Sequence, residues 1–214
     1  MSNPVTIIDY GIGNMLSVVR AFEYCGAYVT VSESLDSVNE VERLVLPGVG
    51  AFANGMAELS ARNLVEPIQA FAATGKPFLG ICLGMQMMLD TSEEFGQSTG
   101  LGLIPGQVVA IPSYGIDGIP HKIPHIGWNE LLRPVHPGDW KGSILTQLSY
   151  GTPVYFVHSF MAVPENGDHR LADCHYDGQA ICAAIRRDNI YGCQFHPEKS
   201  GEAGLAIVRE FLRL

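Results

Sequence analysis

The chain has 214 residues, of which 47% are hydrophobic and 16% are charged, and its 13 basic and 22 acidic side chains give a formal net charge of −9. That balance is typical of a folded globular protein, and the acidic excess argues against nucleic acid and anionic membrane surfaces as partners, because both require clustered basic side chains. No apolar run reaches the roughly 18 residues of a membrane span, and the N-terminus lacks the features of a signal peptide, so we expect a cytoplasmic protein.

The first half of the chain alternates strand-like and helix-like segments. Short β-rich runs predict strands at 5–8, 27–31, 43–46 and 77–81. Apolar residues at helical spacing predict a helix that starts near Met15 and stops at Gly26, and further helices at 51–59, 62–74 and 84–90. Strands that alternate with helices favour βαβ units and a mainly parallel sheet.

The second half reads as strands joined by short turns, followed by one helix. The expected strands are 107–111, 125–132, 154–160, 171–176, 180–186 and 190–195. Asp188 and Asn189 form a plausible hairpin turn, and residues 201–214 have the pattern of an amphipathic helix. We expect these strands to be antiparallel and to pack on or extend the parallel core, in a single α/β domain that covers residues 1–214 and has a mixed central sheet flanked by helices.

The cysteines number five, and no two of them have Cys-x-x-Cys spacing. The odd count and the spacing argue against a disulfide framework and a zinc ribbon. Each cysteine is by default a small buried apolar residue. A cysteine that departs from this default must do so through its neighbours.

The sequence GICLG at 80–84 surrounds one such cysteine. It follows the apolar pair Phe78 and Leu79 and precedes a helix-like segment. Small residues two positions before and after a nucleophile permit the sharp strand-to-helix turn that lifts its side chain to the end of a sheet. Cys82 would then lie at a helix N-terminus, where partial positive charge favours the thiolate. The pattern predicts a nucleophile; the alternative is a buried cysteine in a glycine-rich turn.

The tripeptide His196, Pro197 and Glu198 follows the expected strand 190–195. Pro197 disfavours α-helical backbone angles at His196, the residue before it. A carboxylate two residues on can orient the imidazole and stabilise its charged form. Alone, such a tripeptide is an ordinary strand-end turn. Together with Cys82 at the end of another strand, it predicts a Cys–His–Glu triad.

The sequence PGVG at 47–50 follows the expected strand 43–46. Glycine-rich strand ends expose backbone N–H groups. One of these, together with the N–H of Leu83, could hold a developing oxyanion. The alternative is a tight turn into the next helix.

Several motifs carry a resemblance to a known family. GICLGMQ at 80–86, HPE at 196–198 and PGVGAF at 47–52 resemble the motifs of the triad-type, or class I, glutamine amidotransferases. The resemblance narrows to the glutamine amidotransferase subunit of imidazole glycerol phosphate synthase through IDYGIGN at 8–14, PHIGWN at 124–129, YFVHSF at 155–160 and FHPEKS at 195–200. The match spans nearly the whole chain in the family's order. It implies hydrolysis of L-glutamine to L-glutamate and ammonia through a γ-glutamyl thioester, with no cofactor and no metal.

The resemblance assigns roles to matching positions. Cys82 would be the nucleophile, His196 the general base and acid, and Glu198 the orienting carboxylate. Leu83 with Val49 and Gly50 would form the oxyanion hole, in a loop whose backbone switches between inactive and active conformations.

Further positions match substrate contacts of the family. Gln86 and Glu94 would hold the amide and α-amino ends of glutamine, while Gly48, Ser159 and Phe160 would contact it as well. Without the family match, Glu94 reads as a solvated charge beside Glu93.

The resemblance also implies a partner chain, since only 16 residues follow Glu198. The partner would be a cyclase subunit with a (β/α)₈ barrel, which uses the ammonia in histidine biosynthesis and forms a heterodimer with this chain. Asn14, Trp128, Tyr155 and Lys199 match interface positions. The alternatives are a core aromatic for Trp128, an isolated exposed charge for Lys199 and a helix cap for Asn14.

Three other functions remain open from the sequence. The chain could serve another acceptor enzyme, such as one of pyridoxal phosphate or aminobenzoate synthesis. It could be a cysteine hydrolase or peptidase, although Gln86 and Glu94 suit a free amino acid better than a peptide. It could also be a catalytically silent assembly subunit, against which the intact Cys82, His196 and Glu198 argue.

Overall fold

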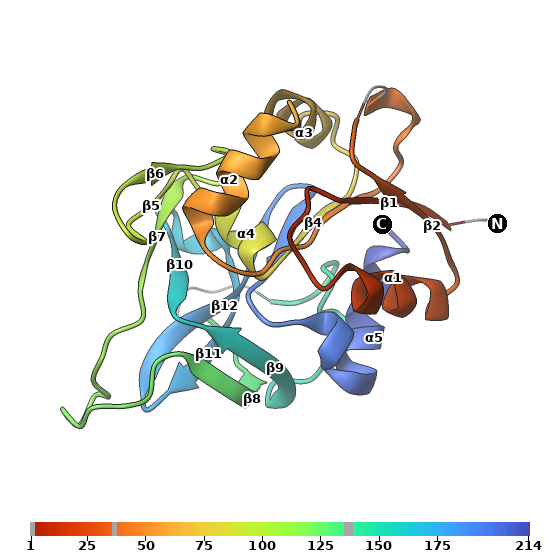
Figure 1. Cartoon of the computed structure of the whole chain (residues 1–214). Coiled ribbons are helices and arrows are strands. Elements are labelled where there is room, and N and C mark those ends of the chain that lie inside the picture. Colours follow the sequence, from red (N-terminus) through yellow and green to blue (C-terminus); the bar gives the residue numbers. More distant parts are fainter. Residues whose placement is uncertain (1–2, 36–37, 135–138) are drawn as a thin grey trace.

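The computed structural model describes residues 3–35, 38–134 and 139–214. Within these ranges the strands form a seven-stranded, a four-stranded and a two-stranded sheet. The seven-stranded sheet has the order β11-β12-β13-β4-β3-β1-β2 and has helices on both faces (Figure 1). The single α/β domain with a mixed sheet that the sequence predicts is confirmed.

The N-terminal half builds the parallel part of the large sheet, as predicted. Its strands are β1 (Asn3–Ile8), β2 (Ala27–Ser32), β3 (Leu44–Leu46) and β4 (Phe78–Ile81). Its helices are α1 (Met15–Tyr24), α2 (Phe52–Ala61), α3 (Val65–Ala72) and α4 (Leu83–Met87), with a short 3₁₀ helix η1 (Val38–Glu40) before β3. Gly26 has a φ of 86° and ends the α1 region at the predicted position.

The C-terminal half extends the large sheet and adds two small ones. Its longer strands are β7 (Gly106–Ala110), β8 (His125–Leu131), β9 (Thr152–His158), β10 (Phe160–Pro164), β11 (Arg170–Tyr176), β12 (Gln179–Arg187) and β13 (Ile190–Cys193). The short elements are β5 (Thr91–Ser92), β6 (Ser98–Thr99), η2 (Gly167–His169) and η3 (Pro197–Lys199), and the chain closes with α5 (Gly201–Phe211).

Strand β13 corrects the expected direction of pairing. It is antiparallel to β12, to which the predicted turn at Asp188 and Asn189 connects it, but it is parallel to β4. The expectation of antiparallel pairing in the second half therefore fails at this contact, and it fails also where β7 runs parallel to the short β5. The consequence is functional, because the parallel pairing brings the C-terminal ends of β4 and β13 to the same edge of the sheet.

The predicted strand 154–160 is two strands that part at Ser159. β9 pairs with β8, whereas β10 pairs with β7 in the four-stranded sheet. A continuous strand could not serve both partners, because they belong to different sheets. The break places Ser159 at a bend instead of in a ladder.

Three helices are shorter than predicted. α3 begins at Val65 rather than at 62, because Asn63 has a φ of 55°. α4 ends at Met87 rather than at 90, since the carbonyls of Met87 and Met88 accept hydrogen bonds from Leu101 and Leu103. α5 ends at Phe211. None of the helices in the described part of the chain has the length and apolarity needed to cross a membrane.

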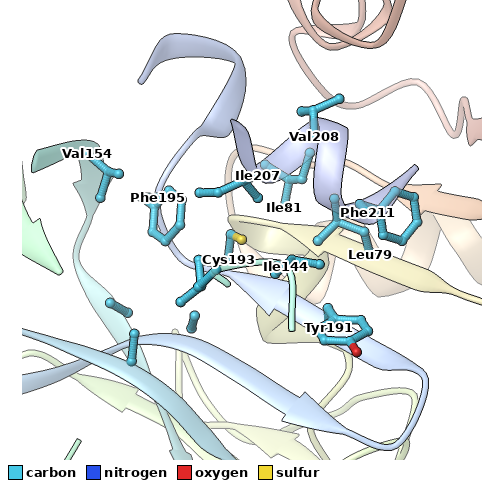
Figure 2. Packing of buried hydrophobic residues seen from close by; sticks show 14 of the residues in the cluster. Leu79, Ile81, Ile144, Val154, Tyr191, Cys193, Phe195, Ile207, Val208 and Phe211 are labelled. Atoms are coloured by element: carbon cyan, nitrogen blue, oxygen red, sulfur yellow. The ribbon is translucent and has the colours of Figure 1, made fainter. Parts of the chain in front are cut away.

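Two apolar clusters fix the helices to opposite faces of the large sheet. On one face α1 and α5 lie side by side (Figure 1) and pack on Ile7, Val45 and Leu79. Figure 2 shows Ile207, Val208 and Phe211 of α5 reaching toward the strand residues Leu79 and Ile81. On the other face α2, α3 and α4 pack on Ile8, Leu44, Leu46 and Phe78. Burial of these side chains supplies the main stabilisation of the fold.

Gly80 and Gly84 allow the turn between β4 and α4 to pack tightly. A Cβ built on Gly84 would lie 1.8 Å from the carbonyl oxygen of Leu46, and one on Gly80 would lie 2.7 Å from the backbone nitrogen of Met85. Neither backbone neighbour can yield as a flexible side chain would. The glycines of the GICLG sequence are thus required by the close approach of α4 to β3 and β4.

We predict that Gly84→Ala lowers the free energy of unfolding by about 3 kcal/mol or more, because the added methyl group must displace β3. Gly75→Ala is the matched control. Gly75 has a φ of 79° but no atom within 4 Å of the built Cβ, so only backbone strain of about 1–2 kcal/mol is added. Urea unfolding followed by circular dichroism measures both losses, and equal losses would contradict the packing argument.

Candidate active site

A cavity of about 430 Å³ lies beyond the C-terminal end of β4. It gathers residues from both halves of the chain. The lining residues are Val49, Gly50, Cys82, Leu83, Gln86, Glu94, Pro124, Val157, His158, Ser159, Phe160 and His196. Nine of these were predicted site residues, whereas Pro124, Val157 and His158 were not.

Cys82 occupies a strained turn between β4 and α4. Its φ is 53° and its ψ is −109°, a conformation that side-chain-bearing residues rarely adopt. Its N–H donates to the carbonyl of Cys193 at 2.7 Å, which ties the turn to β13. The predicted strand-to-helix elbow is present, and it places the sulfur at the cavity wall with only 7% of the residue exposed.

His196 and Glu198 form a buried pair beside the thiol. Nδ1 of His196 lies 2.7 Å from Oε1 of Glu198, and both side chains are 2% exposed. Among the described residues no hydrogen bond reaches Nε2 of His196 or the second oxygen of Glu198. Burial lowers the pKa of His196, but its interactions with the Cys82 thiol and the Glu198 carboxylate outweigh burial and raise that pKa to about 10. The pair therefore favours a protonated imidazole.

The backbone around His196 is held from two directions. Its N–H donates to the carbonyl of Tyr155 at 3.0 Å, and its own carbonyl accepts from the Ser200 hydroxyl at 2.7 Å. The N–H of Tyr155 in turn donates to the Ser200 oxygen at 3.0 Å. Strand β9 thus fixes the loop that carries the His–Glu pair.

The loop at Pro47–Gly50 faces the Cys82 turn in a blocked arrangement. The N–H of Leu83 donates to the carbonyl of Gly48 at 3.3 Å, so this donor is occupied by the protein itself. The buried Tyr10 hydroxyl donates to the carbonyl of Pro47 at 2.9 Å. A Cβ on Gly48 would lie 2.2 Å from the Tyr10 oxygen, which explains the glycine there, and Gly50 has a φ of 98°.

Glu94 is buried against the N-terminus of α2. One carboxylate oxygen accepts a hydrogen bond from the N–H of Phe52 at 2.6 Å, where the helix leaves N–H groups unpaired. The residue is 9% exposed and lines the cavity. The alternative of a solvated charge beside Glu93 is therefore wrong, and Glu94 offers negative charge to the cavity.

Gln86 reaches across the cavity floor. Its amide nitrogen donates to the carbonyl of Phe160 and to Oε1 of Gln194, each at 3.0 Å. Gln194 itself lies 3.8 Å from the Cys82 sulfur through its own amide nitrogen. The sequence patterns do not single out His158, which lies inside the YFVHSF motif, or Gln194, which directly precedes FHPEKS, because apolar-strand patterns do not show which polar side chain turns inward.

The four predicted interface residues lie outside the cavity lining. Trp128 is 58% exposed on β8 and makes an edge contact with Tyr155 of β9, with ring centroids 6.1 Å apart. The alternative of a core aromatic for Trp128 is therefore wrong. Asn14 and Lys199 are exposed, and Asn14 makes no side-chain cap hydrogen bond at the start of α1. Asn14 thus occupies the N-cap position of α1, but its side chain does not supply a cap hydrogen bond.

The arrangement is suited to acyl transfer through a thiol. It combines a cysteine on a strained turn, an imidazole oriented by a carboxylate, and backbone N–H groups at a strand end. The buried carboxylate of Glu94 gives the cavity a place for a cationic group. The described ranges hold no group of three or more side chains placed to bind a metal ion.

Comparisons with known proteins agree with this geometry. The family described as glutamine amidotransferase class I matches residues 6–214. The imidazole glycerol phosphate synthase subunit HisH 1 of Legionella pneumophila (strain Lens) is 59% identical over 210 residues, which cover 98% of this chain and 99% of the relative. The HisH subunit of Syntrophotalea carbinolica is 45% identical over 97% of this chain and 98% of its own length.

Solved structures share the fold at low sequence identity. The structure of PurLQS from Thermotoga maritima superposes with a TM-score of 0.71 at 20% identity, covering 100% of this chain and 99% of that chain. A glutamine amidotransferase from the same organism gives a TM-score of 0.60 at 16% identity over 94% of this chain and 78% of the other. The family match, the near-complete coverage of these relatives and the shared fold lead to one conclusion: the chain belongs to the class I glutamine amidotransferase family.

Proposed function

We propose that this chain is the glutaminase subunit of an imidazole glycerol phosphate synthase in histidine biosynthesis. The observation that carries the proposal is the identity of 59% along nearly the whole chain with a HisH subunit. The pairing of Cys82 with a carboxylate-bound His196 supports the chemistry. Identity of this extent favours the histidine-pathway enzyme over an amidotransferase that serves another acceptor, a peptidase or a silent subunit.

The reaction begins at the thiol. The Cys82 sulfur, as thiolate, attacks the side-chain carbonyl carbon of glutamine and forms a tetrahedral oxyanion. His196, protonated on Nε2 and held through Nδ1 by Glu198, then gives its proton to the departing nitrogen, and the carbon–nitrogen bond breaks. Ammonia leaves and a γ-glutamyl thioester on Cys82 remains.

Water completes the cycle. His196, now neutral, removes a proton from a water molecule that attacks the thioester carbonyl. The carbon–sulfur bond breaks, glutamate leaves, and the thiolate and the imidazolium are restored. The raised pKa of His196 suits this role, because the imidazole recovers its proton readily at neutral pH.

The oxyanion hole is closed in the resting loop. Leu83 lines the cavity, but its N–H donates to the carbonyl of Gly48. Rotation of the peptide between Gly48 and Val49 would withdraw that carbonyl and present the N–H of Val49, so that Leu83 and Val49 donate to the oxyanion together. The glycines on either side of Val49 make such a rotation easy. We infer that binding of the partner drives it.

Glutamine would be held between charged and polar groups on opposite sides of the cavity. Glu94 would take the α-ammonium group, and Gln86 with the backbone of Ser159 and Phe160 would take the polar groups of the substrate. Gly48 and Gly50 leave room for the substrate amide beside Cys82. The buried placement of Glu94 supports its role, since a carboxylate shielded from water attracts a cation more strongly.

The ammonia would pass to a separate cyclase subunit with a (β/α)₈ barrel. Exposed apolar residues include Val49, which lines the cavity, and Ile126 and Trp128 on β8, whose neighbour β9 contributes Val157 and His158 to the cavity lining. Exposed apolar residues of this kind suit contact with a protein partner. Asn14, Tyr155 and Lys199 would join this interface. The five free cysteines support the proposal that the complex works in the cytoplasm.

We predict that Cys82→Ala lowers glutamate release by roughly 10⁴-fold or more in the complex with the cyclase subunit, because no thioester can form. Synthesis from added ammonium salts should persist. Cys25→Ser is the control, since Cys25 is outside the cavity and the hydroxyl keeps a donor for the carbonyl of Leu205. Loss of the ammonium-dependent reaction in Cys82→Ala would show that Cys82 is structural.

Glu198→Gln should lower kcat for glutamate release by roughly 10²–10⁴-fold. The reason is that the imidazole loses the carboxylate that orients it and stabilises its protonated form. The pKa of His196 should fall, since the carboxylate raises it. Glu202→Gln, at a glutamate that is 80% exposed, is the matched control and should behave as the wild type. Steady-state kinetics test the first effect and NMR titration of His196 the second. Wild-type kcat in Glu198→Gln would rule out the triad.

Tyr10→Phe should raise the glutaminase rate of the chain without its partner. The lost bond to Pro47, worth about 1 kcal/mol, should ease the loop rotation about fivefold. Tyr28→Phe, at an exposed tyrosine, is the control. An unchanged or lower rate in Tyr10→Phe would contradict the idea that Tyr10 stabilises the closed loop.

A further inference from the structure

Two buried histidines lie side by side on β8 and β9, next to the cavity. His125 and His158 face each other in the strand register, and Nδ1 of His125 is 3.1 Å from Nε2 of His158. Nδ1 of His158 lies 2.8 Å from the carbonyl oxygen of Phe160. At the far end, the amide nitrogen of Asn129 lies 3.4 Å from Nε2 of His125. The residues are 3% and 6% exposed, and neither has a role in the mechanism above.

The contacts from Asn129 through His125 and His158 to Phe160 form a series of hydrogen bonds, and they show which ring nitrogens carry a proton. A carbonyl oxygen can only accept, so Nδ1 of His158 carries a proton and donates to Phe160. In a neutral ring Nε2 of His158 then accepts, and Nδ1 of His125 donates to it. Nε2 of His125 accepts in turn from the Asn129 amide, whose nitrogen also donates to the carbonyl of His175 at 2.7 Å. The series runs in one direction, from Asn129 to Phe160.

The surroundings keep both rings neutral. Burial lowers the pKa of each to about 4, against the weaker opposing effects of Asp177 on His125 and of the Phe160 carbonyl on His158. Electrostatic interactions with His121 lower the pKa of His125 further, and those with His125 and His196 do the same for His158. The rings of Phe156 and Tyr176 stack on His125, with centroids 5.0 Å and 4.2 Å away, and exclude water from it.

The Phe160 carbonyl receives a second donor from the cavity side. Gln86 donates to it at 3.0 Å and also donates to Gln194, whose amide nitrogen faces the Cys82 sulfur at 3.8 Å. The orientation of this one carbonyl therefore bears on two things: the bend at Ser159 and Phe160 that lines the cavity, and the amide that faces the nucleophile.

We propose that His158 is a positioning residue that, by donating from Nδ1 to the Phe160 carbonyl, fixes the cavity rim and, through Gln86 and Gln194, the amide that faces the Cys82 sulfur. The proposal rests on the proposed glutaminase function for its consequence in catalysis. His125 keeps His158 in the tautomer that can donate. The amide nitrogen of Gln194 faces the sulfur at 3.8 Å, so the orientation of this amide affects how the thiol reacts.

Two substitutions at His158 distinguish the hydrogen bond at Nδ1, to Phe160, from the contact at Nε2, with His125. Asparagine places an amide near the position of Nδ1 and can keep the bond to Phe160, whereas glutamine extends toward the position of Nε2 and loses it. In the complex with the cyclase subunit, His158→Gln should lower kcat/KM for glutamine roughly tenfold to a hundredfold, mainly through KM. His158→Asn should recover most of that loss. The rate at which iodoacetamide alkylates Cys82 should fall in His158→Gln and recover in His158→Asn. Mass spectrometry of the peptide that contains Cys82 measures this rate.

The outcomes decide between positioning and mere packing. Wild-type behaviour of both variants, or equal loss in both, would overturn the proposal. Should His158→Gln fail to fold, Gln194→Met tests the other end of the series: slower alkylation of Cys82 and a lower kcat support the proposal, and unchanged values overturn it. If the wild-type complex releases no glutamate, the proposed function fails, but the alkylation rates still decide whether His158 positions the thiol's surroundings.

Discussion

The conformation of Cys82 is the constraint on which the site depends. A side-chain-bearing residue that combines a φ of 53° with a ψ of −109° is strained, and it persists only where the surrounding structure holds it. Here the Cys82 N–H is bound by Cys193 of β13, while Gly84 lies against β3. The central strands of the sheet therefore hold the proposed nucleophile in place, and the same parallel arrangement brings His196 to the same edge. The apolar layers that flank the sheet give this geometry its rigidity.

Histidines near the cavity are tuned in opposite directions by their partners. His196 contacts a carboxylate and the thiol, and these interactions outweigh burial and raise its pKa to about 10. His125 and His158 face each other, a carbonyl and aromatic rings, so burial prevails and lowers their pKa to about 4. The first suits proton transfer. The other two suit fixed hydrogen bonding, because a ring that stays neutral keeps the same donor and acceptor. Burial alone does not decide a histidine's role; the charge of its partner does.

The resting loop explains why such a site would need a partner. The side chains proposed to react lie together, yet the backbone N–H of Leu83 donates to the carbonyl of Gly48. The energetic difference between closed and open loop then rests on a few hydrogen bonds, among them that from Tyr10 to Pro47. A partner that binds beside the cavity needs to favour the open loop by only this small amount. Glutamine hydrolysis would thereby be limited to complexes that can use the ammonia.

The sequence by itself determined the fold class, most of the elements and the identity of the catalytic candidates, because apolar periodicity and the GICLG and HPE motifs are local patterns. Nine predicted site residues do line one cavity. Only the tertiary structure decided that β13 runs parallel to β4, that the strand expected at 154–160 parts at Ser159, and that Glu94 is buried at the start of α2. It alone joined His125, His158, Phe160, Gln86 and Gln194 into one series of hydrogen bonds. Such contacts join residues up to 108 positions apart, and no local pattern encodes which polar groups folding will bring together.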